Sequence, residues 1–95
     1  MPNDQDPWLD YVQRLRSAGR LSRSDRDVLV VLRACRGDSE RACPRQAILI
    51  ERSSRSEESV RRALRRGRDL GLIAWERSRT GVNIYSFHLP PGARP

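Results

Sequence analysis

The sequence predicts a mainly α-helical domain that ends in a small β-hairpin, which places it in the α+β class. Four segments before residue 71 carry apolar residues at the spacing of one helix face. Two short runs after residue 71 alternate apolar and polar side chains, as strands do. Ninety-five residues suffice for one domain. We place this domain at residues 7–90. The polar residues 1–6 before it are expected to be disordered, and residues 91–95 after it are expected to form a tail.

The first helix is expected over residues 7–20 as an accessory N-terminal element. Pro7 suits the first helical position, and Asp6 is a suitable N-cap. Gly19 ends the apolar stripe, which comprises Trp8, Leu9, Tyr11, Val12 and Leu15. Such an amphipathic helix either covers the core of its own domain or forms a dimer contact, and the sequence leaves both open.

The second helix begins at Ser22 or Ser24 and is the best candidate for the central core helix. Ser24 with Asp27 resembles a capping box that has Asp in place of the usual Glu. The turn over residues 36–40 follows a wide apolar face made of Val28, Leu29, Val31, Leu32 and Cys35.

A third, short helix is expected from Pro44, at its first position, to about Arg52. The four consecutive apolar residues 47–50 would also suit a buried strand. The flanking proline and the Ser53-Ser54 turn favour the helix.

The fourth helix is the most arginine-rich segment of the chain. Ser56 is its expected N-cap, and Glu57 and Glu58 lie in the first turn, where the helix dipole favours acids. Gly71 closes it. One face is apolar, with Val60, Ala63, Leu64 and Leu70, and the rest of the surface carries Arg61, Arg62, Arg65, Arg66 and Arg68.

A hairpin is expected beyond Gly71, with strands over residues 72–76 and 82–89 and a tip at residues 77–81. Ile73 and Trp75 alternate on the first strand. Tyr85, Phe87 and Leu89 alternate on the second. For the aromatic residues Trp8, Trp75 and Tyr85, core packing is favoured over the stacking of bases.

Charge is concentrated in one part of the chain. The formal net charge is +7, and all nineteen basic residues are arginines. Residues 1–40 hold seven arginines and seven acids, whereas residues 41–80 hold eleven arginines and five acids, a net charge of +6. An excess of one sign in one block favours a nucleic-acid partner. With no apolar run of membrane-spanning length and an acidic N-terminus, we expect no membrane association and a cytoplasmic location.

The remaining chemistry-bearing residues give little sign of an enzyme. Cys35 and Cys43 are expected to be small buried thiols, with a disulfide across residues 36–42 as a minor alternative. His88 is the only histidine and is expected at the surface, so the three residues make no convincing zinc site. No catalytic arrangement is evident, and we expect no cofactor and no metal.

The stretch from Cys43 to Phe87 resembles the winged helix-turn-helix domains of bacterial DNA-binding proteins. The resemblance consists of Pro44, Leu49-Ile50, Ser56, Ser59-Val60, Ala63-Leu64, Leu70-Gly71-Leu72-Ile73 and Asn83-Ile84-Tyr85. It implies a helix-turn-helix at residues 44–70 and a wing at residues 72–89. Departures are Ser53 and Ser54 before the turn, Arg55 in place of a valine, and Gly67 in place of a leucine. Gly67 either permits close helix approach or loosens the helix.

The resemblance further implies that the helix after Ser56 lies in the major groove of duplex DNA. Base contacts are then expected from Ser56, Glu58, Ser59, Arg61, Arg62 and Arg65. Backbone contacts are expected from Arg45, Gln46, Arg55, Arg66, Arg77, Arg79 and Thr80. Two alternatives stay open. Glu57 and Glu58 are favoured as partners of the helix dipole that suppress nonspecific binding, and Arg66 and Arg68 would alternatively pair with Asp69 or other acids.

We therefore expect a small homodimer that binds a specific double-stranded DNA site, acting as a transcriptional repressor by operator occupancy without a small-molecule effector. One alternative is a plasmid or phage replication or maintenance factor that binds an origin. Another is a protein–protein interaction module that docks an acidic partner. RNA is less favoured because the A-form major groove does not admit a helix.

Overall fold

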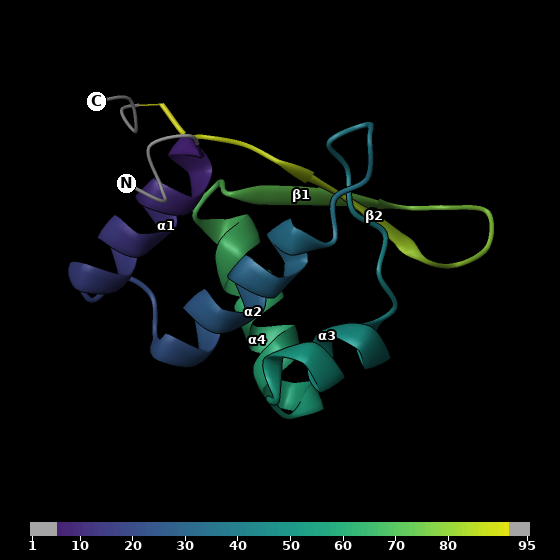
Figure 1. The fold of residues 1–95 in the computed structure, drawn as a ribbon, viewed down its shortest axis with the longest axis horizontal. Coiled ribbons are helices and arrows are strands. Elements are labelled where there is room, and N and C mark those ends of the chain that lie inside the picture. The colour runs from purple at the N-terminus through teal and green to yellow at the C-terminus, as the bar shows by residue number, and fades with distance from the viewer. Residues whose placement is uncertain (1–5, 92–95) are drawn as a thin grey trace.

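The computed structural model describes residues 6–91 and confirms a mainly helical α+β fold. Its elements follow one another as expected (Figure 1). They are α1 (Pro7–Ser17), α2 (Arg23–Ala34), α3 (Gln46–Ser53), α4 (Glu57–Asp69), β1 (Ile73–Arg77) and β2 (Asn83–Phe87). The disorder expected for residues 1–6 and the tail expected at residues 91–95 fall outside the described residues, except at Pro91 and at Asp6, where the expectation is wrong because Asp6 is the N-cap of α1. No helix between residues 6 and 91 is long and apolar enough to cross a bilayer.

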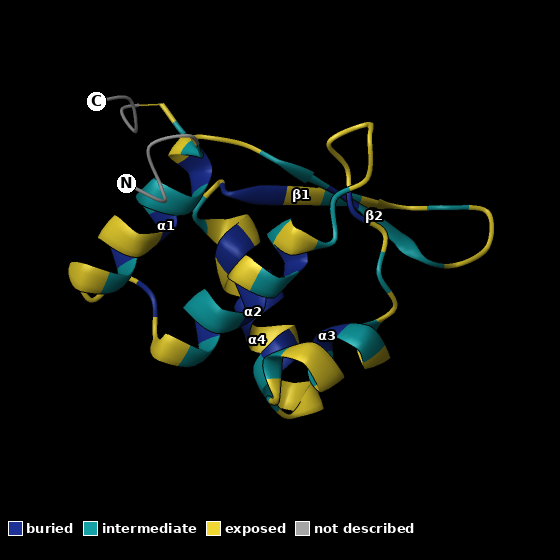
Figure 2. Ribbon diagram, in the orientation of Figure 1, coloured by how far each residue is buried: buried dark blue, intermediate teal, exposed yellow. Residues whose placement is uncertain are grey.

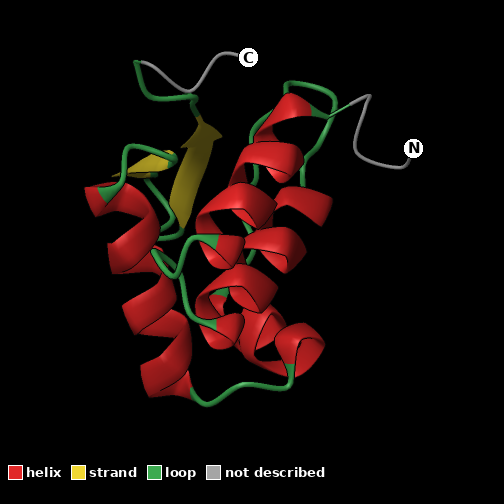
Figure 3. Cartoon of the chain, turned by 90° about the vertical axis from the view of Figure 1, so that its left-hand side faces the viewer, coloured by secondary structure: helices red, strands yellow, loops and turns green. Residues whose placement is uncertain are grey.

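Helix α2 is the centre of the core, as its wide apolar face predicted. It packs against α1, α3 and α4, and α4 in turn contacts β1. Val28, Leu29 and Leu32 of α2 are fully buried, and they meet Val12 of α1 and Val60 of α4 in one cluster. Figure 2 shows dark blue, buried stretches in the helices and in the hairpin that lies above them. The strands lie at one end of the helical layer (Figure 3).

The N-terminal caps explain where α1 and α2 begin. Asp6 accepts hydrogen bonds from the backbone N–H groups of Trp8 and Leu9 at 3.1 and 3.2 Å, as expected of an N-cap. Helix α2 is capped by Ser22, whose Oγ accepts from the Asp25 N–H at 3.0 Å while Asp25 accepts from the Ser22 N–H.

The expected capping box of Ser24 with Asp27 is therefore wrong. The physical reason is that Leu21, just before the true cap, is buried in the core and fixes the start of the helix at Ser22. Asp27 is left to pair with arginines instead.

Pro44 precedes α3 rather than opening it. Ala42 and Tyr85 exchange two backbone hydrogen bonds, at 2.7 and 3.1 Å, which keep this linker extended against β2. The helix therefore starts only at Gln46, with Arg45 at the N-cap and no side-chain capping bond. Residues 47–50 are helical and not a strand, and of these Leu49 is fully buried while Ala47 is exposed.

Gly67 and Ser54, two departures noted in the sequence, each occupy a position with a special backbone or packing requirement. A Cβ at Gly67 would lie 2.9 Å from Leu29 Cδ2 and 3.3 Å from Ile73 Cδ1, so this glycine permits close approach of α4 to α2 and β1. Ser54 ends α3 with a φ of 58°, the left-handed conformation that glycine usually supplies.

The hairpin is antiparallel, with Trp75 opposite Tyr85 and Arg77 opposite Asn83. Both strands are offset from the expected ranges. Leu72 lies just before β1, although its carbonyl still accepts a bond from the His88 N–H, and Leu89 lies beyond β2 and is 39% exposed. His88 is exposed, as expected. Gly81, with a φ of 85°, forms the turn at the tip.

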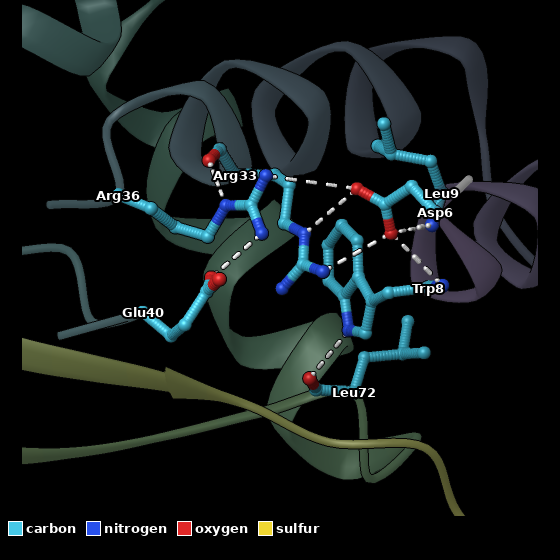
Figure 4. Close-up of polar contacts among 7 residues, drawn as sticks. All are labelled: Asp6, Trp8, Leu9, Arg33, Arg36, Glu40 and Leu72. Atoms are coloured by element: carbon cyan, nitrogen blue, oxygen red, sulfur yellow. Dashed lines mark hydrogen bonds and ion pairs between the residues drawn. The ribbon is translucent and has the colours of Figure 1, made fainter. Parts of the chain in front are cut away.

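A polar cluster ties the start of α1 to α2 and to Leu72, just before β1 (Figure 4). The Arg33 guanidinium donates to both oxygens of Asp6, at 3.0 and 3.1 Å. The same group lies 5.2 Å from the Trp8 ring centroid and 4.9 Å from that of Phe87. Trp8 Nε1 donates to the Leu72 carbonyl at 2.9 Å. With Trp8, Val12 and Leu15 of α1 buried, this helix covers the core of its own domain.

The expectation that Cys35 and Cys43 are buried is wrong. Both thiols are free, Cys35 is only partly buried at the end of α2, and Cys43 is exposed. Cys43 follows Ala42, which is the inward-facing residue of the extended linker, so alternation turns Cys43 outward.

Candidate nucleic-acid interface

Helix α4 is divided between an apolar side and an arginine side. Val60, Ala63, Leu64 and Gly67 are buried against the core. The five arginines of the helix are all exposed. Because residues three and four apart share a helix face, the inward residues fix the arginines on the outer side.

The N-terminus of α4 is closed by its own serines. Ser56 Oγ accepts from the Ser59 N–H at 3.1 Å and bonds to the Ser59 hydroxyl at 3.0 Å. Ser56 is therefore the N-cap that the sequence predicted. Both hydroxyls are engaged in the free protein, so a base contact from either would have to share or replace these bonds.

The two acids of the first turn each hold an arginine one turn later. Glu57 pairs with Arg61 at 3.2 Å, and Glu58 pairs with Arg62 at 3.4 Å. The two arginine side chains remain 59% and 69% exposed. Exposed pairs at this spacing contribute only about 0.3–0.5 kcal/mol. A phosphate or a base edge therefore competes easily for either arginine.

A groove runs between α4 and the hairpin and contains many of the expected contact residues. Its larger part has a volume of about 380 Å³ and is lined by Arg45 and Gln46 from the start of α3, Arg61 from α4, and Arg77 and Asn83 from the hairpin. It continues into a second hollow of about 250 Å³ that Arg65, Arg68 and Trp75 line. The fold thus brings together residues that are up to 38 positions apart in the sequence, from Arg45 to Asn83.

The aromatic floor of this groove belongs to the core. Tyr85 is almost fully buried, and its burial raises the pKa of the phenol although Asn83 donates a hydrogen bond to it at 3.4 Å. Trp75 packs against Tyr85 with ring centroids 5.5 Å apart, and the Arg68 guanidinium lies 4.6 Å above the Trp75 ring. Core packing, as expected, accounts for the positions of these rings. Arg68 stacks on Trp75, and no acid of residues 6–91 lies within ion-pair distance of it.

Arg55 and Arg66 lie outside the groove. Arg55 is half-buried and pairs with Asp27 at 2.6 Å, which joins the turn before α4 to α2. Burial alone would raise the pKa of Asp27, but hydrogen bonds from Arg55 and Arg26 and their charges hold it below its usual value. Arg66 donates to the Arg20 carbonyl at 3.2 and 3.3 Å. Their contacts with DNA stay predictions.

The tip of the hairpin carries the remaining expected residues. Arg77 Nε donates to the Gly81 carbonyl at 3.3 Å, which braces the turn. Arg79 and Thr80 are exposed at the tip, where Thr80 shares a hydrogen bond with Ser78 at 2.9 Å. Among residues 6–91, no carboxylate lies within ion-pair distance of Arg45, Arg65, Arg77 or Arg79.

Sequence reasoning missed Asn83 and Arg68 as lining residues of the groove. Strand alternation offered a signal for Asn83, because it shares a strand face with the buried Tyr85. For Arg68, the spacing of seven residues from Arg61 places both on the same flank of α4. No family model, no curated protein and no solved structure matches this chain.

Proposed function

We propose that this protein is a winged helix-turn-helix protein that binds a specific site in double-stranded DNA. The observation that carries the proposal is the arginine side of α4 beside a groove lined with further arginines. A three-residue connection, residues 54–56, joins α3 to α4, and a hairpin follows directly. In this reading α3 and α4 form the helix-turn-helix and the hairpin is the wing.

The dimensions of α4 support a position in the major groove. Its thirteen residues span about 20 Å. A helix with its side chains is about 10–12 Å across, and the major groove of B-DNA is about 12 Å wide. Arg61, Arg62 and Arg65 then reach base edges, where a guanidinium makes a bidentate contact with guanine. Glu58 is placed to accept from a cytosine amino group when it releases Arg62.

The groove beside α4 suits the sugar–phosphate backbone. Arg45 and Arg77 in the groove, and Arg79 at the hairpin tip, supply positive charge that no acid of residues 6–91 neutralises. Phosphate contacts of this kind fix the register of a protein on a duplex, whereas base contacts select the sequence. The biological role we propose is that of a small homodimeric repressor acting by operator occupancy.

Two measurements test the proposal. Genomic fragments bound by the protein are selected and sequenced, and binding to the recovered duplex is followed by fluorescence anisotropy at increasing salt. About six phosphate contacts per protomer predict a slope of roughly −5 in log affinity against log salt concentration. A flat salt response would exclude DNA binding of this kind.

The same experiments separate the alternatives. Sites clustered at an origin instead of promoters would assign a replication or maintenance role on the same interface. Absence of any shift with duplex DNA at low salt would favour a module that docks an acidic protein partner. If the protein binds as a dimer, half-sites should lie about 10 bp, or a multiple of this spacing, apart.

A further inference from the structure

We propose that the turn between α1 and α2 is a second site for DNA phosphates, on the side of α4 opposite the hairpin. Arg20 and Arg23 of this turn, together with Arg66 of α4, form what we call the turn cluster. The inference rests on the proposed function. It extends the interface to one arginine pair, Arg20 and Arg23, for which the sequence pattern predicted no role.

The position of the turn follows from the Arg66 contact. Arg66 Nε and Nη2 donate to the Arg20 carbonyl, at 3.3 and 3.2 Å, and so hold the turn against the flank of α4. At about 100° per residue, Arg66 lies roughly 140° around the helix from Arg61. Arg61 lines the groove beside the hairpin, so the turn cluster lies on the other flank, and Arg62 and Arg65 lie between the two.

The turn is held rigidly at both ends. The Arg20 N–H donates to the Leu15 carbonyl at 2.8 Å and the Gly19 N–H to the Arg16 carbonyl at 3.1 Å, while Gly19 adopts a φ of 77°. Leu21 is 3% exposed and anchors the turn in the core. The capping box of Ser22 then starts α2 at once. Arg20 and Arg23 therefore project from a backbone that needs no ordering on binding.

The charges of the turn cluster favour an anion. Arg20 and Arg23 are exposed, and neither pairs with a carboxylate within residues 6–91. Arg23 occupies the first position of α2, where the helix dipole disfavours a cation. A phosphate at this place is bound by the guanidinium groups, since Ser22 and Asp25 already cap the N-terminus of α2. The acid nearest in sequence, Asp25, is only 7% exposed and is turned into the helix cap.

The geometry of duplex DNA gives this cluster a defined partner. A helix that fills the major groove has one phosphate strand on each of its flanks. The hairpin and the start of α3 lie toward one strand, and the turn cluster lies toward the other. The structure thus assigns the two sets of arginines to different strands.

Ethylation interference on the selected duplex tests this assignment strand by strand. The test variant is R20Q/R23Q, and the control is R14Q/R52Q, which removes the same charge from two exposed positions of α1 and α3. We expect R20Q/R23Q to lose interference at phosphates of one strand only and to lower the magnitude of the salt slope by about 2. Base preference should stay the same, and the control should match the wild type. R20K/R23K, which retains the charge, should restore the slope.

The outcomes distinguish this inference from the proposed function. If the wild type binds DNA but R20Q/R23Q keeps every interference site and the full slope, the turn cluster does not contact phosphate. If R14Q/R52Q weakens binding equally, only overall charge matters and the cluster is no site. A wild type without salt-dependent DNA binding would overturn the proposed function itself, and this inference with it.

Discussion

Arg33 and Arg65 carry the same guanidinium group, but the two regions that hold them use it in different ways. Arg33 is enclosed by Asp6, Trp8 and Phe87, and its side chain is 15% exposed. Arg65 stands exposed on α4 with no acid of residues 6–91 in ion-pair distance. The contrast teaches that an arginine is structural or available according to its partners, which sequence-wide charge counts do not reveal.

Removing the enclosed arginine gives the largest expected effect on stability. Arg33→Ala leaves the Asp6 carboxylate without its bidentate partner and removes a cation from between two rings. We expect a loss of about 3 kcal/mol in the free energy of unfolding, measured by urea denaturation. DNA affinity of the folded protein should stay within twofold of the wild type. Arg14→Ala, at an exposed ion pair of α1, is the control and should cost less than about 1 kcal/mol. Equal losses in the two variants would contradict the structural role of Arg33.

Removing the exposed Arg65 should weaken DNA binding and leave the stability of the fold almost unchanged. Arg65→Ala is expected to weaken binding to the selected site by about 1–3 kcal/mol, or roughly 5- to 150-fold, because a base-edge contact is lost. Unfolding free energy should change by less than about 0.5 kcal/mol, since the side chain is at the surface. Anisotropy titrations against the selected site and against single-base variants measure the effect.

Arg61→Ala and Arg62→Ala should act in the same direction as Arg65→Ala and relax base preference. Arg52→Ala, on the exposed side of α3, serves as the control for general charge. Unchanged binding in all three α4 variants would mean that α4 is not the helix that reads the DNA sequence.

Acid should weaken the enclosed cluster and leave the exposed arginines unaffected. Burial alone would raise the pKa of Asp6, but the hydrogen bonds from Arg33 and the Leu9 N–H and the charges of Arg33 and Arg36 hold it below its ordinary value of 3.8. A pKa lowered by folding stabilises the protein above the unfolded value. This stabilisation is lost as the pH falls through the folded value.

Asp6→Asn measures that contribution, because asparagine still caps α1 but carries no charge. We expect the variant to be less stable than the wild type by about 1 kcal/mol at pH 7 and at pH 5. The difference should shrink progressively below about pH 4, as the wild-type carboxyl takes up its proton. Denaturation curves at pH 7, 5 and 3 provide the measurement. A difference that persists in full at pH 3 would show that Asp6 contributes no charge-dependent stability.

The smallest effect is expected from the acids of α4. Glu58→Gln releases Arg62 and removes a negative charge from the surface that we propose faces DNA. Affinity for nonspecific duplex should rise by about two- to fivefold, in keeping with the small energy of an exposed pair. Binding to random-sequence DNA at low salt measures it, and Glu51→Gln on α3 is the matched control. If nonspecific affinity falls, Glu58 does not restrain the arginine face.

The helices and the hairpin could be predicted because local signals fix them. Asp6, Ser56 and Gly71 mark helix ends by capping chemistry that depends on neighbours in the sequence. The apolar stripe of α4 gave its buried side, with Val60, Ala63 and Leu64. The start of α2 stayed open between Ser22 and Ser24, and its capping box was assigned to the wrong pair, because Ser22-Asp25 and Ser24-Asp27 both match a cap and only the burial of Leu21 decides between them.

The residues of the candidate site on α4, and Arg45, Gln46 and Arg77 outside it, could be named from the sequence, but the contacts that join distant segments around the site could not. The ion pair of Arg55 with Asp27 joins positions 28 residues apart, and the contact of Arg66 with Arg20 joins positions 46 apart. No spacing rule covers such distances. The same holds for Ala42 with Tyr85, a pairing that displaced Pro44 from α3 and depends on the linker meeting β2 in space.

That pairing also sets how far the hairpin can extend. Ala42 pairs with Tyr85 in β2 and so fixes the hairpin to the body of the protein. Residues 77–82, at the tip, lie beyond this contact. Lengthening each strand by two residues would move the tip outward by about 7 Å and keep every side chain on its present face. Insertions in the hairpin can therefore change the distance between its tip and the packed helices without disturbing those helices.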